Sequence, residues 1–569
     1  MSLDPAILAE PGRLALRPPN LLLVGFSGAG KSAVGRAVAS RLGLPFVDLD
    51  QAIVARSGRP IPEIFREAGE TAFRRLEAET LAAELAQGGR VIALGGGAWI
   101  QPRVRQLLGP ADAAVWLDVP FEEAWRRIKN QRGRPLVDGL GREGLEGLYA
   151  ERRAAYALAD HRLDVAGRPV EAVAGELARW WERRPQALVR PDPHGPGYGV
   201  HLRPKLLEEA GEHLAAAGLE GPVLVVSQEP LRGYASRLEA ALAARGFRTG
   251  WHWMENGEEA KTPEAARAIW AAALEAGLDR RGTVIAFGGG VVGDTAGFAA
   301  ATFLRGVRWA AIPSTLLGQV DAAVGGKVGV NLPQGKNLVG AFHHPRVVLA
   351  DPELLATLPR RELAAGMAEV VKALLLAGPD PVLELEPRLH GGLAAWEPFI
   401  AAAIRLKAAT VSRDPQEEGL RAILNLGHTV GHALEVITGY RRYLHGEAVA
   451  VGLVTALILS ERVAGLDPEW TRRVVRLLQG LGLPADAPEL HDPALLPKLA
   501  QALRRDKKAR QGRARFVLLE APGRPRVGVE VDPRLLAEVF ERQAGMGAAS
   551  SGRRCQAPRQ RTVTDGARL

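Results

Sequence analysis

Residues 21–32 read LLLVGFSGAGKS, an apolar run followed by a glycine-rich segment that ends in lysine and serine. Residues 25–32 fit the pattern G-x-x-x-x-G-K-[ST], and the flanking sequence predicts a strand before the loop and a helix after it. In such a loop backbone N–H groups turn toward phosphate oxygens, Lys31 reaches the β- and γ-phosphates, and Ser32 ligates Mg²⁺. We therefore predict an ATP site. Its expected contacts are Gly28, Ala29, Gly30, Lys31, Ser32 and Ala33.

Short apolar runs alternate with helical patterns on both sides of a break near residue 183. Such alternation predicts parallel α/β sheets, and the break at 183–187, which prolines and glycines follow, indicates a linker and a hairpin-like entry to the next domain. The expected fold class is α/β. A three-layer α/β/α domain (19–182) is followed by a second domain (188–541), which has a Rossmann-like part (188–351) and a helical, metal-binding part (352–541). The strands are expected at 21–24, 46–47, 91–94, 114–117, 223–226, 283–287, 309–312 and 515–519.

The composition limits the classes of protein to which this chain can belong. Its 569 residues exceed one compact core, and its single cysteine, Cys555, excludes a disulfide framework and a cysteine-based zinc site. Residues 1–18 carry no signal-peptide pattern, and the longest apolar run, 448–460, is too short to cross a bilayer. We expect a cytoplasmic protein with no membrane segment.

The net charge of +9 comes in part from the arginine-rich residues 542–569. These residues are poor in apolar side chains, so we expect a disordered basic tail there, and a second, N-terminal tail at 1–18. The remaining positive charge is scattered and suits small substrates that carry phosphate. We therefore expect no nucleic-acid partner.

Candidate residues for a phosphate acceptor follow the phosphate loop. Asp48 and Asp50 are expected at the end of the second strand and on the same face, one near Mg²⁺ and the other near the acceptor hydroxyl. Arg74 lies in a helical stretch, and a glycine triplet at 95–97 follows a buried strand. Glycine lets a substrate approach the backbone closely, so these residues predict a small-molecule acceptor.

Residues 19–182 resemble shikimate kinase in the phosphate loop and in DLD at 48–50, FRRLE at 73–77, GGG at 95–97 and RPL at 134–136. The resemblance implies that Lys31, Asp50 and Arg134 are catalytic, that Arg134 closes over the ATP phosphates, and that Asp48 holds Mg²⁺ through water. It implies that shikimate is bound by Asp50, Arg74, Gly96 and Arg152. The family pattern Arg-x-Pro-Leu-Tyr is replaced by RRAAY at 152–156, so Arg152 or Arg153 could reach the substrate carboxylate; we favour Arg152.

The second half contains GGGVVGD at 288–294, after an expected strand. The match to G-x-G-x-x-G is weak, because no acidic residue follows some twenty positions later as a dinucleotide-binding fingerprint requires. A glycine turn that holds a pyrophosphate is still expected here.

A metal site is indicated by His428 and His432, which lie one helical turn apart in NLGHTVGH (425–432). His445 and Glu369 are further candidate ligands, and such a set leaves positions open for substrate oxygens. Five basic residues lie in otherwise apolar, glycine-rich sequence. This setting indicates that they bind an anionic substrate rather than form a solvated surface. They are Lys327, Lys336, Lys372, Lys407 and Arg421.

Residues 187–540 resemble 3-dehydroquinate synthase. The matching segments are 256–261, 288–294, 313–315, 321–331, 336–337, 366–372, 417–432, 445–447 and 506–508. The resemblance implies that Glu369, His428 and His445 hold Zn²⁺ or Co²⁺ and that His432, Lys327, Lys372 and Lys407 are catalytic. The implied substrate contacts are Asp321, Lys327, Lys336, Asn337, Lys372, Lys407, Arg421, Asn425 and His432. The implied NAD contacts are Asn256, Gly257, Glu258, Glu259, Ala260, Lys261, Gly290, Val291, Val292, Gly293, Asp294, Ser314, Thr315, Lys327, Lys336, Leu354, Leu355, Ala356 and Thr357.

Together the resemblances imply a phosphotransferase joined to a lyase that recycles its NAD in each turnover. Two other interpretations are open. A different small-molecule kinase could be joined to a polyol dehydrogenase with net NADH production, against which Lys327 and Lys336 count. Alternatively, the first domain could be an ATP-sensing regulator, which only the altered segment 152–156 supports. We expect small-molecule substrates and a homodimer formed through the second domain.

Overall fold

The computed structural model describes residues 17–129, 135–192, 197–505 and 514–548. The chain divides into two compact units, Met1–Leu424 with Ala521–Pro525 and Asn425–Glu520 with Arg526–Leu569. Among the described residues, no helix is long and apolar enough to cross a membrane.

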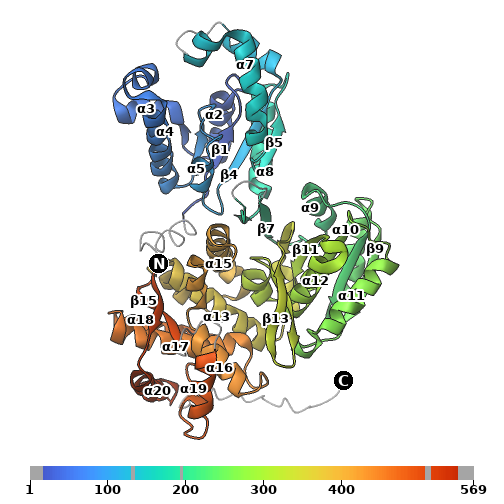
Figure 1. Ribbon diagram of the computed structural model, residues 1–569, viewed down its shortest axis with the longest axis vertical. Helices are drawn as coiled ribbons and strands as arrows, with labels where there is room; N and C mark the ends of the chain where they lie inside the picture. The colour runs from blue at the N-terminus through green and yellow to red at the C-terminus, as the bar shows by residue number, and fades with distance from the viewer. Residues whose placement is uncertain (1–16, 130–134, 193–196, 506–513, 549–569) are drawn as a thin grey trace, which may run out of the picture. The chain divides into compact units, whose positions relative to one another are not determined.

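The first sheet has five parallel strands in the order β2-β3-β1-β4-β5 (Figure 1). The strands are β1 (Leu21–Val24), β2 (Phe46–Asp48), β3 (Val91–Ala93), β4 (Ala113–Asp118) and β5 (His161–Asp164). The helices are α2 (Lys31–Leu42), α3 (Leu49–Ser57), α4 (Ile61–Gln87), α5 (Pro102–Gln106), α6 (Phe121–Ile128), α7 (Pro135–Tyr156) and α8 (Val170–Arg183). This arrangement confirms the predicted parallel α/β fold.

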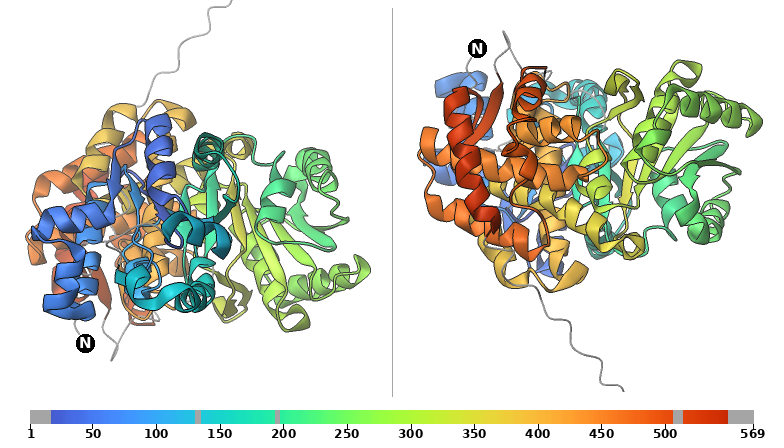
Figure 2. Two further views of the ribbon diagram at one scale, coloured as in Figure 1. Left: turned by 90° about the horizontal axis from the view of Figure 1, so that it is seen from above. Right: turned by 90° about the horizontal axis from the view of Figure 1, so that it is seen from below.

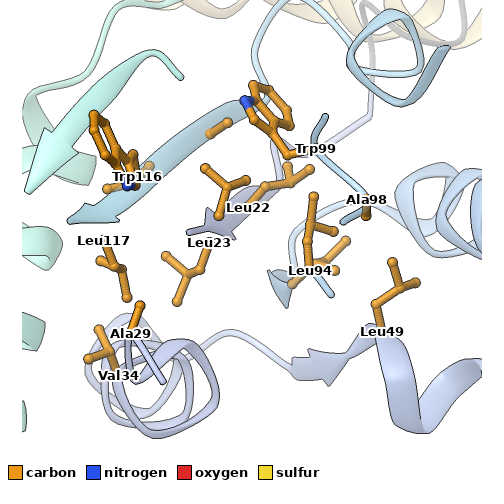
Figure 3. Close-up of a cluster of buried hydrophobic side chains, with 14 of the residues drawn as sticks. Leu22, Leu23, Ala29, Val34, Leu49, Leu94, Ala98, Trp99, Trp116 and Leu117 are labelled. Carbon is orange, nitrogen blue, oxygen red and sulfur yellow. The ribbon is translucent and has the colours of Figure 1, made fainter. Parts of the chain in front are cut away.

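The central strand β1 is buried along its whole length, which explains why residues 21–24 are all apolar. Figure 3 shows Leu22 and Leu23 of β1 among side chains from its neighbours, including Trp116 and Leu117 of β4. Ala29 of the phosphate loop belongs to the same buried cluster. The loop is therefore fixed to the core on one side, which holds its backbone in place.

The second sheet has seven strands in the order β6-β7-β14-β11-β10-β8-β9. β6 is antiparallel to β7, as the predicted hairpin-like entry requires, and the other strands are parallel. The strands are β6 (Ala187–Val189), β7 (Tyr198–Leu202), β8 (Val223–Gln228), β9 (Thr249–Met254), β10 (Thr283–Gly288), β11 (Arg308–Pro313) and β14 (Val347–Ala350).

Helices cover both faces of this sheet (Figure 2). Alternate side chains of β8, β10, β11 and β14 pack with leucines of α9 (Ala210–Ala216) and α10 (Ala235–Ala243) in one buried cluster. The helices α11 (Pro263–Glu275) and α12 (Gly290–Thr302) also contact strands of this sheet but do not belong to that cluster. An antiparallel hairpin packs on α12 and consists of β12 (Lys327–Leu332) and β13 (Gly335–Phe342). The short helices are η1 (Glu229–Tyr234), η2 (Glu258–Ala260), η3 (Phe303–Arg305), η4 (Gly318–Ala322) and η5 (Pro352–Thr357).

The expected change to helical structure after residue 351 is present, but the compact division lies near residue 424. Several helices after the sheet belong to the same unit as the sheet, because α15 packs against β6 and α13 against α15. These helices are α13 (Arg360–Ala377), α14 (Pro379–Leu385), η6 (Glu386–Arg388), α15 (Gly392–Arg413) and η7 (Leu420–Asn425), the last of which ends at the division.

The second unit is built around the contact between α16 (His428–Ile437) and α17 (His445–Val463). Glycines make this contact close, because a Cβ on Gly452 would overlap the carbonyl oxygen of Gly427. The other elements are α18 (Pro468–Gly480), η8 (Pro488–Leu490), α19 (Leu496–Arg505), β15 (Arg515–Ala521), β16 (Arg524–Glu530) and α20 (Pro533–Ala548). β15 contains the strand predicted at 515–519.

The tail predicted from residue 542 onward begins too early. α20 continues to Ala548, and Gln543 within it is fully buried. The Gln543 amide donates to the carbonyl oxygens of Val451 (3.0 Å) and Ala485 (2.9 Å) and accepts from the Thr455 hydroxyl (2.7 Å). The sequence suggested disorder because a buried glutamine does not contribute to an apolar pattern. Residues 549–569 lie outside the described residues.

Gln543→Leu should lower the free energy of unfolding by about 1–3 kcal/mol, because buried carbonyl groups of Val451 and Ala485 lose their donors. Urea titration of the full-length protein measures the change. Glu541→Gln, an exposed position on the same helix, is the matched control and should have little effect. Equal losses from both substitutions would contradict a specific role for Gln543.

Candidate active sites

The phosphate loop connects β1 to α2 and depends on its glycines. Gly25, Gly28 and Gly30 have φ values of 141°, 85° and 87°, which side chains rarely tolerate. A Cβ on Gly28 would also lie 2.7 Å from the Ala124 carbonyl oxygen. The Lys31 ammonium donates to the carbonyl oxygens of Gly25 (2.8 Å) and Phe26 (3.0 Å). Its charge is therefore held over the loop, while Ser32 and Ala33 continue into α2.

Ser32 and Asp48 lie together, as a magnesium site requires. The Ser32 hydroxyl donates to Asp48 Oδ2 at 2.6 Å. Asp48 ends β2 and also caps α3, where its side chain accepts from the backbone N–H of Gln51. Asp50 is therefore in the first turn of α3, and its predicted place on the strand was wrong. The physical reason is the cap: an aspartate at this position starts a helix at the next residue.

The glycine triplet lies against the predicted acceptor-binding side chains. A Cβ on Gly95 would lie 2.7 Å from Asp50 Oδ1, and one on Gly97 would lie 2.6 Å from Arg74 Nη2. Arg74 is oriented by Glu77, whose Oε2 accepts from Arg74 Nη1 at 2.9 Å. The structure thus brings Asp50, Arg74 and the triplet together, with glycines where a Cβ would press on the ends of the Asp50 and Arg74 side chains.

Two adjacent arginines have different surroundings. Arg152 is buried, and its Nη1 donates to the Gly96 carbonyl at 3.2 Å. Arg153 instead pairs with Asp118 (3.1 Å) and donates to the Tyr149 hydroxyl (2.7 Å). Arg152 therefore lies at the glycine triplet with the other predicted substrate residues, and Arg153 joins α7 to the end of β4.

Two residues of this region were missed by the sequence analysis. Glu77 is buried, and burial raises its pKa although Arg74 opposes the shift; its place three residues after Arg74 on a helix could have identified it. Arg127 donates to the Gly28 carbonyl at 3.0 Å and adds a charge beside the phosphate loop, but no local pattern marks it. Arg134 lies outside the described residues.

In the second domain, a polar network joins three segments of the predicted NAD site. Buried Lys261 pairs with Asp294 at 2.5 Å and also donates to Asn337 Oδ1. Asn331 donates to Glu258 at 2.8 Å and accepts from the Asn337 backbone N–H at 2.9 Å. Burial raises the pKa of Asp294, against the effect of Lys261. The segment 256–261, the start of α12 and the β12–β13 hairpin are therefore tied together.

The other predicted NAD residues follow the carboxyl ends of neighbouring parallel strands. Residues 290–294 follow β10, residues 314–315 follow β11, and residues 354–357 follow β14 in η5. A Cβ on Gly289 would lie 2.9 Å from Thr315 Cγ2, so the first two segments touch. Dinucleotides bind at this edge of parallel sheets. Leu354 and Leu355 are each 1% exposed, so both residues are buried in the structure.

The predicted cationic residues of the first unit are paired with acids or carbonyl groups. Lys407 pairs with Asp321, Lys327 with Glu417 and buried Lys372 with Glu369. Arg421 donates to the carbonyl oxygens of Gly325 (3.2 Å) and Pro415 (2.9 Å), and Lys336 lies 3.8 Å from Glu258. Burial lowers the pKa of Lys407 and of Arg421. Cations whose positions are fixed by such partners are suited to bind an anion.

Three histidines of the second unit lie together. The ring centroids of His428 and His432 on α16 are 5.2 Å apart, and His445, the first residue of α17, lies 5.4 Å from His428 and 6.0 Å from His432. One ring nitrogen of His428 lies within 4.8 Å of one of His445. Asn425 is the last residue of η7 in the same loop region. The residues predicted for the metal within this unit are thus brought together.

The surroundings of two histidines fit a metal. His428 Nδ1 lies 3.2 Å from the Leu426 carbonyl oxygen, and His445 Nδ1 lies 3.2 Å from Glu435 Oε2. A hydrogen-bond partner at Nδ1 fixes the orientation of each ring, which is the usual arrangement for histidines in metal sites. Sequence analysis missed buried Glu435, although its position three residues after His432 was a usable signal.

Three protein-family models match this chain. Residues 27–182 match "Shikimate kinase", residues 251–365 match "3-dehydroquinate synthase N-terminal", and residues 366–509 match "3-dehydroquinate synthase C-terminal". The 3-dehydroquinate synthase of Gloeobacter violaceus is 46% identical over 344 residues, which are 60% of this chain and 94% of the relative. The chain thus contains nearly the full length of that enzyme.

Solved structures agree with the second-domain fold. 2-epi-5-epi-valiolone synthase from Streptomyces hygroscopicus, with NAD⁺ and Zn²⁺ bound, is 27% identical, with a TM-score of 0.55 over 61% of this chain and 97% of that one. 2-deoxy-scyllo-inosose synthase, complexed with carbaglucose-6-phosphate, NAD⁺ and Co²⁺, is 26% identical, with a TM-score of 0.55 over 62% and 99%. Both resemble this chain over the domain that contains the histidines.

Proposed function

This chain belongs to the shikimate kinase family over residues 27–182 and to the 3-dehydroquinate synthase family over residues 251–509, and from this premise we propose which residues carry each reaction. The protein is a bifunctional enzyme of the shikimate pathway. Its first domain phosphorylates shikimate with ATP. Its second converts 3-deoxy-D-arabino-heptulosonate 7-phosphate into 3-dehydroquinate and phosphate, with NAD and Zn²⁺ or Co²⁺ as cofactors.

For the kinase, the proposal rests on the meeting of the phosphate loop, the Ser32–Asp48 pair and the glycine triplet. Lys31 neutralises the β- and γ-phosphates, and Ser32 with Asp48 holds Mg²⁺, directly and through water. Asp50 accepts the proton of the shikimate hydroxyl as that oxygen attacks the γ-phosphorus, whose bond to the bridging oxygen breaks so that ADP leaves. Arg74, Gly96 and Arg152 hold the ring, and Arg134 stays a predicted catalytic residue.

Arg152→Ala should raise the KM for shikimate about 10- to 100-fold, since a charge-assisted hydrogen bond contributes roughly 1.5–3 kcal/mol. Steady-state kinetics with varied shikimate measure the effect. Arg153→Ala is the matched control, because Arg153 pairs with Asp118 and not with the triplet; it should lower Tm and leave KM little changed. The reverse pattern would assign the substrate carboxylate to Arg153.

For the synthase, we propose that Glu369, His428 and His445 hold the metal. The supporting observation is that Nδ1 of His428 and Nδ1 of His445 each lie 3.2 Å from an oxygen atom, which fixes the orientation of both rings, as the partners of metal-bound histidines do. When bound, the metal polarises a substrate oxygen while NAD accepts and later returns a hydride. Buried Glu369 lies beside Lys372, whose charge compensates the carboxylate.

The remaining predicted residues bind the two ligands of the synthase. Lys261, Asp294 and the glycine turn of α12 hold NAD through the network at the strand ends. The substrate phosphate and carboxylate are bound by the cationic set, and His432 acts near the substrate. The proposed substrate residues are Asp321, Lys327, Lys336, Asn337, Lys372, Lys407, Arg421, Asn425 and His432.

Assays of one full-length preparation test both reactions. ATP consumption should depend on shikimate, and phosphate release from the heptulosonate phosphate should need catalytic amounts of NAD with no net NADH. Sustained NADH production would instead identify a polyol dehydrogenase, and ATP hydrolysis indifferent to shikimate would support a regulatory first domain. We further propose a homodimer formed through the synthase domain, acting in the cytoplasm; sedimentation analysis tests the dimer.

A further inference from the structure

The loop between α16 and α17 brings His445 back beside the other histidines. Its chain reversal uses two consecutive left-handed residues, Gly439 (φ 63°) and Tyr440 (φ 59°), and the Tyr440 backbone N–H donates to the Glu435 carbonyl at 2.8 Å. A non-glycine residue in this conformation costs roughly 1 kcal/mol or more. Contacts elsewhere in the loop must therefore hold it in this path.

The end of the loop next to His445 is attached to a distant segment. The Tyr443 hydroxyl donates to Glu489 Oε2 at 2.8 Å, and Arg442 pairs with Glu489 Oε1 at 2.5 Å. Glu489 belongs to η8 and is 4% exposed. One buried carboxylate thus binds the two residues that stand two and three positions before His445.

The contacts of Tyr443 and Arg442 with Glu489 should be difficult to break, because burial of a carboxylate costs free energy unless its oxygens are paired. Tyr443 and Arg442 each take one oxygen of Glu489. The loop cannot shift without leaving that charge unpaired. The next residue is fixed separately, since the Leu444 backbone N–H donates to Glu447 Oε2 at 2.8 Å and starts α17.

We propose that Tyr443 is a positioning residue for the metal, which acts by fixing the backbone that carries His445. The proposal rests on His445 being a ligand, as stated under Proposed function. Glu435 sets the rotation of the imidazole ring, while the Tyr443–Glu489 hydrogen bond sets the position of the chain. The ligand geometry therefore needs both contacts, and η8 is part of the metal site although it supplies no ligand.

The test measures zinc affinity of the full-length protein by competition with a chromophoric chelator. Tyr443→Phe should weaken zinc binding about 10- to 100-fold, the range found when partners of metal ligands are removed. Glu489→Gln removes the charge that holds Arg442 and should weaken binding in the same direction. The Tm of each variant reports whether the protein is folded, and Tyr234→Phe, in the other compact unit, is the control for loss of a tyrosine hydroxyl.

The outcomes separate the inference from the proposed function. If His445→Ala abolishes zinc binding while Tyr443→Phe and Glu489→Gln lower Tm and leave zinc affinity unchanged, Tyr443 is merely structural and the inference is overturned. If His445→Ala itself leaves zinc affinity unchanged, the assignment of His445 as a ligand is wrong. If Tyr443→Phe does not fold, weakened zinc binding by Glu489→Gln supports the inference and unchanged binding overturns it.

Discussion

Lys31→Met is expected to lower shikimate-dependent ATP turnover by about 100- to 1,000-fold, the usual effect of removing one donor from developing charge. Methionine keeps the length of the side chain but has no charge for the β- and γ-phosphates. The loop itself should persist, because its shape depends on Gly25, Gly28 and Gly30 and on Ala29 in the core. Lys31→Met should therefore lower the turnover rate and leave the stability of the fold nearly unchanged. Coupled assay of ADP release measures it.

Arg36→Met provides the control for this substitution. Arg36 is on the same helix, with its guanidinium 5.5 Å from the Phe46 ring centroid, and it does not belong to the phosphate loop. Its replacement should leave turnover nearly unchanged, and synthase activity should be intact in both variants. A Lys31→Met enzyme that keeps about a tenth of its kinase activity would contradict the role given to Lys31.

His428→Ala is expected to lower synthase activity by about 1,000-fold or more, because a catalytic metal supplies several kcal/mol of charge stabilisation. Phosphate release from the heptulosonate phosphate and metal content by atomic absorption should fall together. Kinase activity should not change. Treatment of the unmodified enzyme with a strong chelator, followed by dialysis and a kinase assay with fresh Mg²⁺, should reproduce this pattern, and added Zn²⁺ should restore synthase activity only in this unmodified enzyme.

His390→Ala is the control for loss of an imidazole, since His390 is exposed and belongs to the other compact unit. It should keep both its metal and its synthase activity. Full activity of His428→Ala with normal metal content would show that His428 is not a ligand. Loss of activity with normal metal content would place His428 at the substrate instead.

The features predicted correctly are those that depend on residues close together in the sequence. The phosphate loop was predictable because its glycines, Lys31 and Ser32 are consecutive and the loop geometry needs only them. The pairing of His428 with His432 follows from one helical turn. Eight of the sixteen strands in the described residues were also predicted, because buried parallel strands such as β1 are continuously apolar.

Features that depend on distant partners were not predictable in the same way. Asp50 was placed on a strand because the cap made by Asp48 competes with strand continuation. Arg152 and Arg153 could be separated only once Asp118 was located beside Arg153. Buried Gln543 in α20 is explained by carbonyl groups far away in the chain, which no periodicity reveals.

The strand β6 limits how this gene can be divided. β6 pairs with β7 of the synthase sheet, yet it begins at Ala187, directly after α8 of the kinase ends at Arg183. A gene split downstream of β6 would expose the backbone of β7 as a new sheet edge, which favours aggregation. A cut within residues 184–186 keeps α8 with the kinase sheet and β6 with the synthase sheet. Even this cut would break contacts, since Leu188 packs against the kinase core and Arg190 pairs with Asp160 at 2.9 Å.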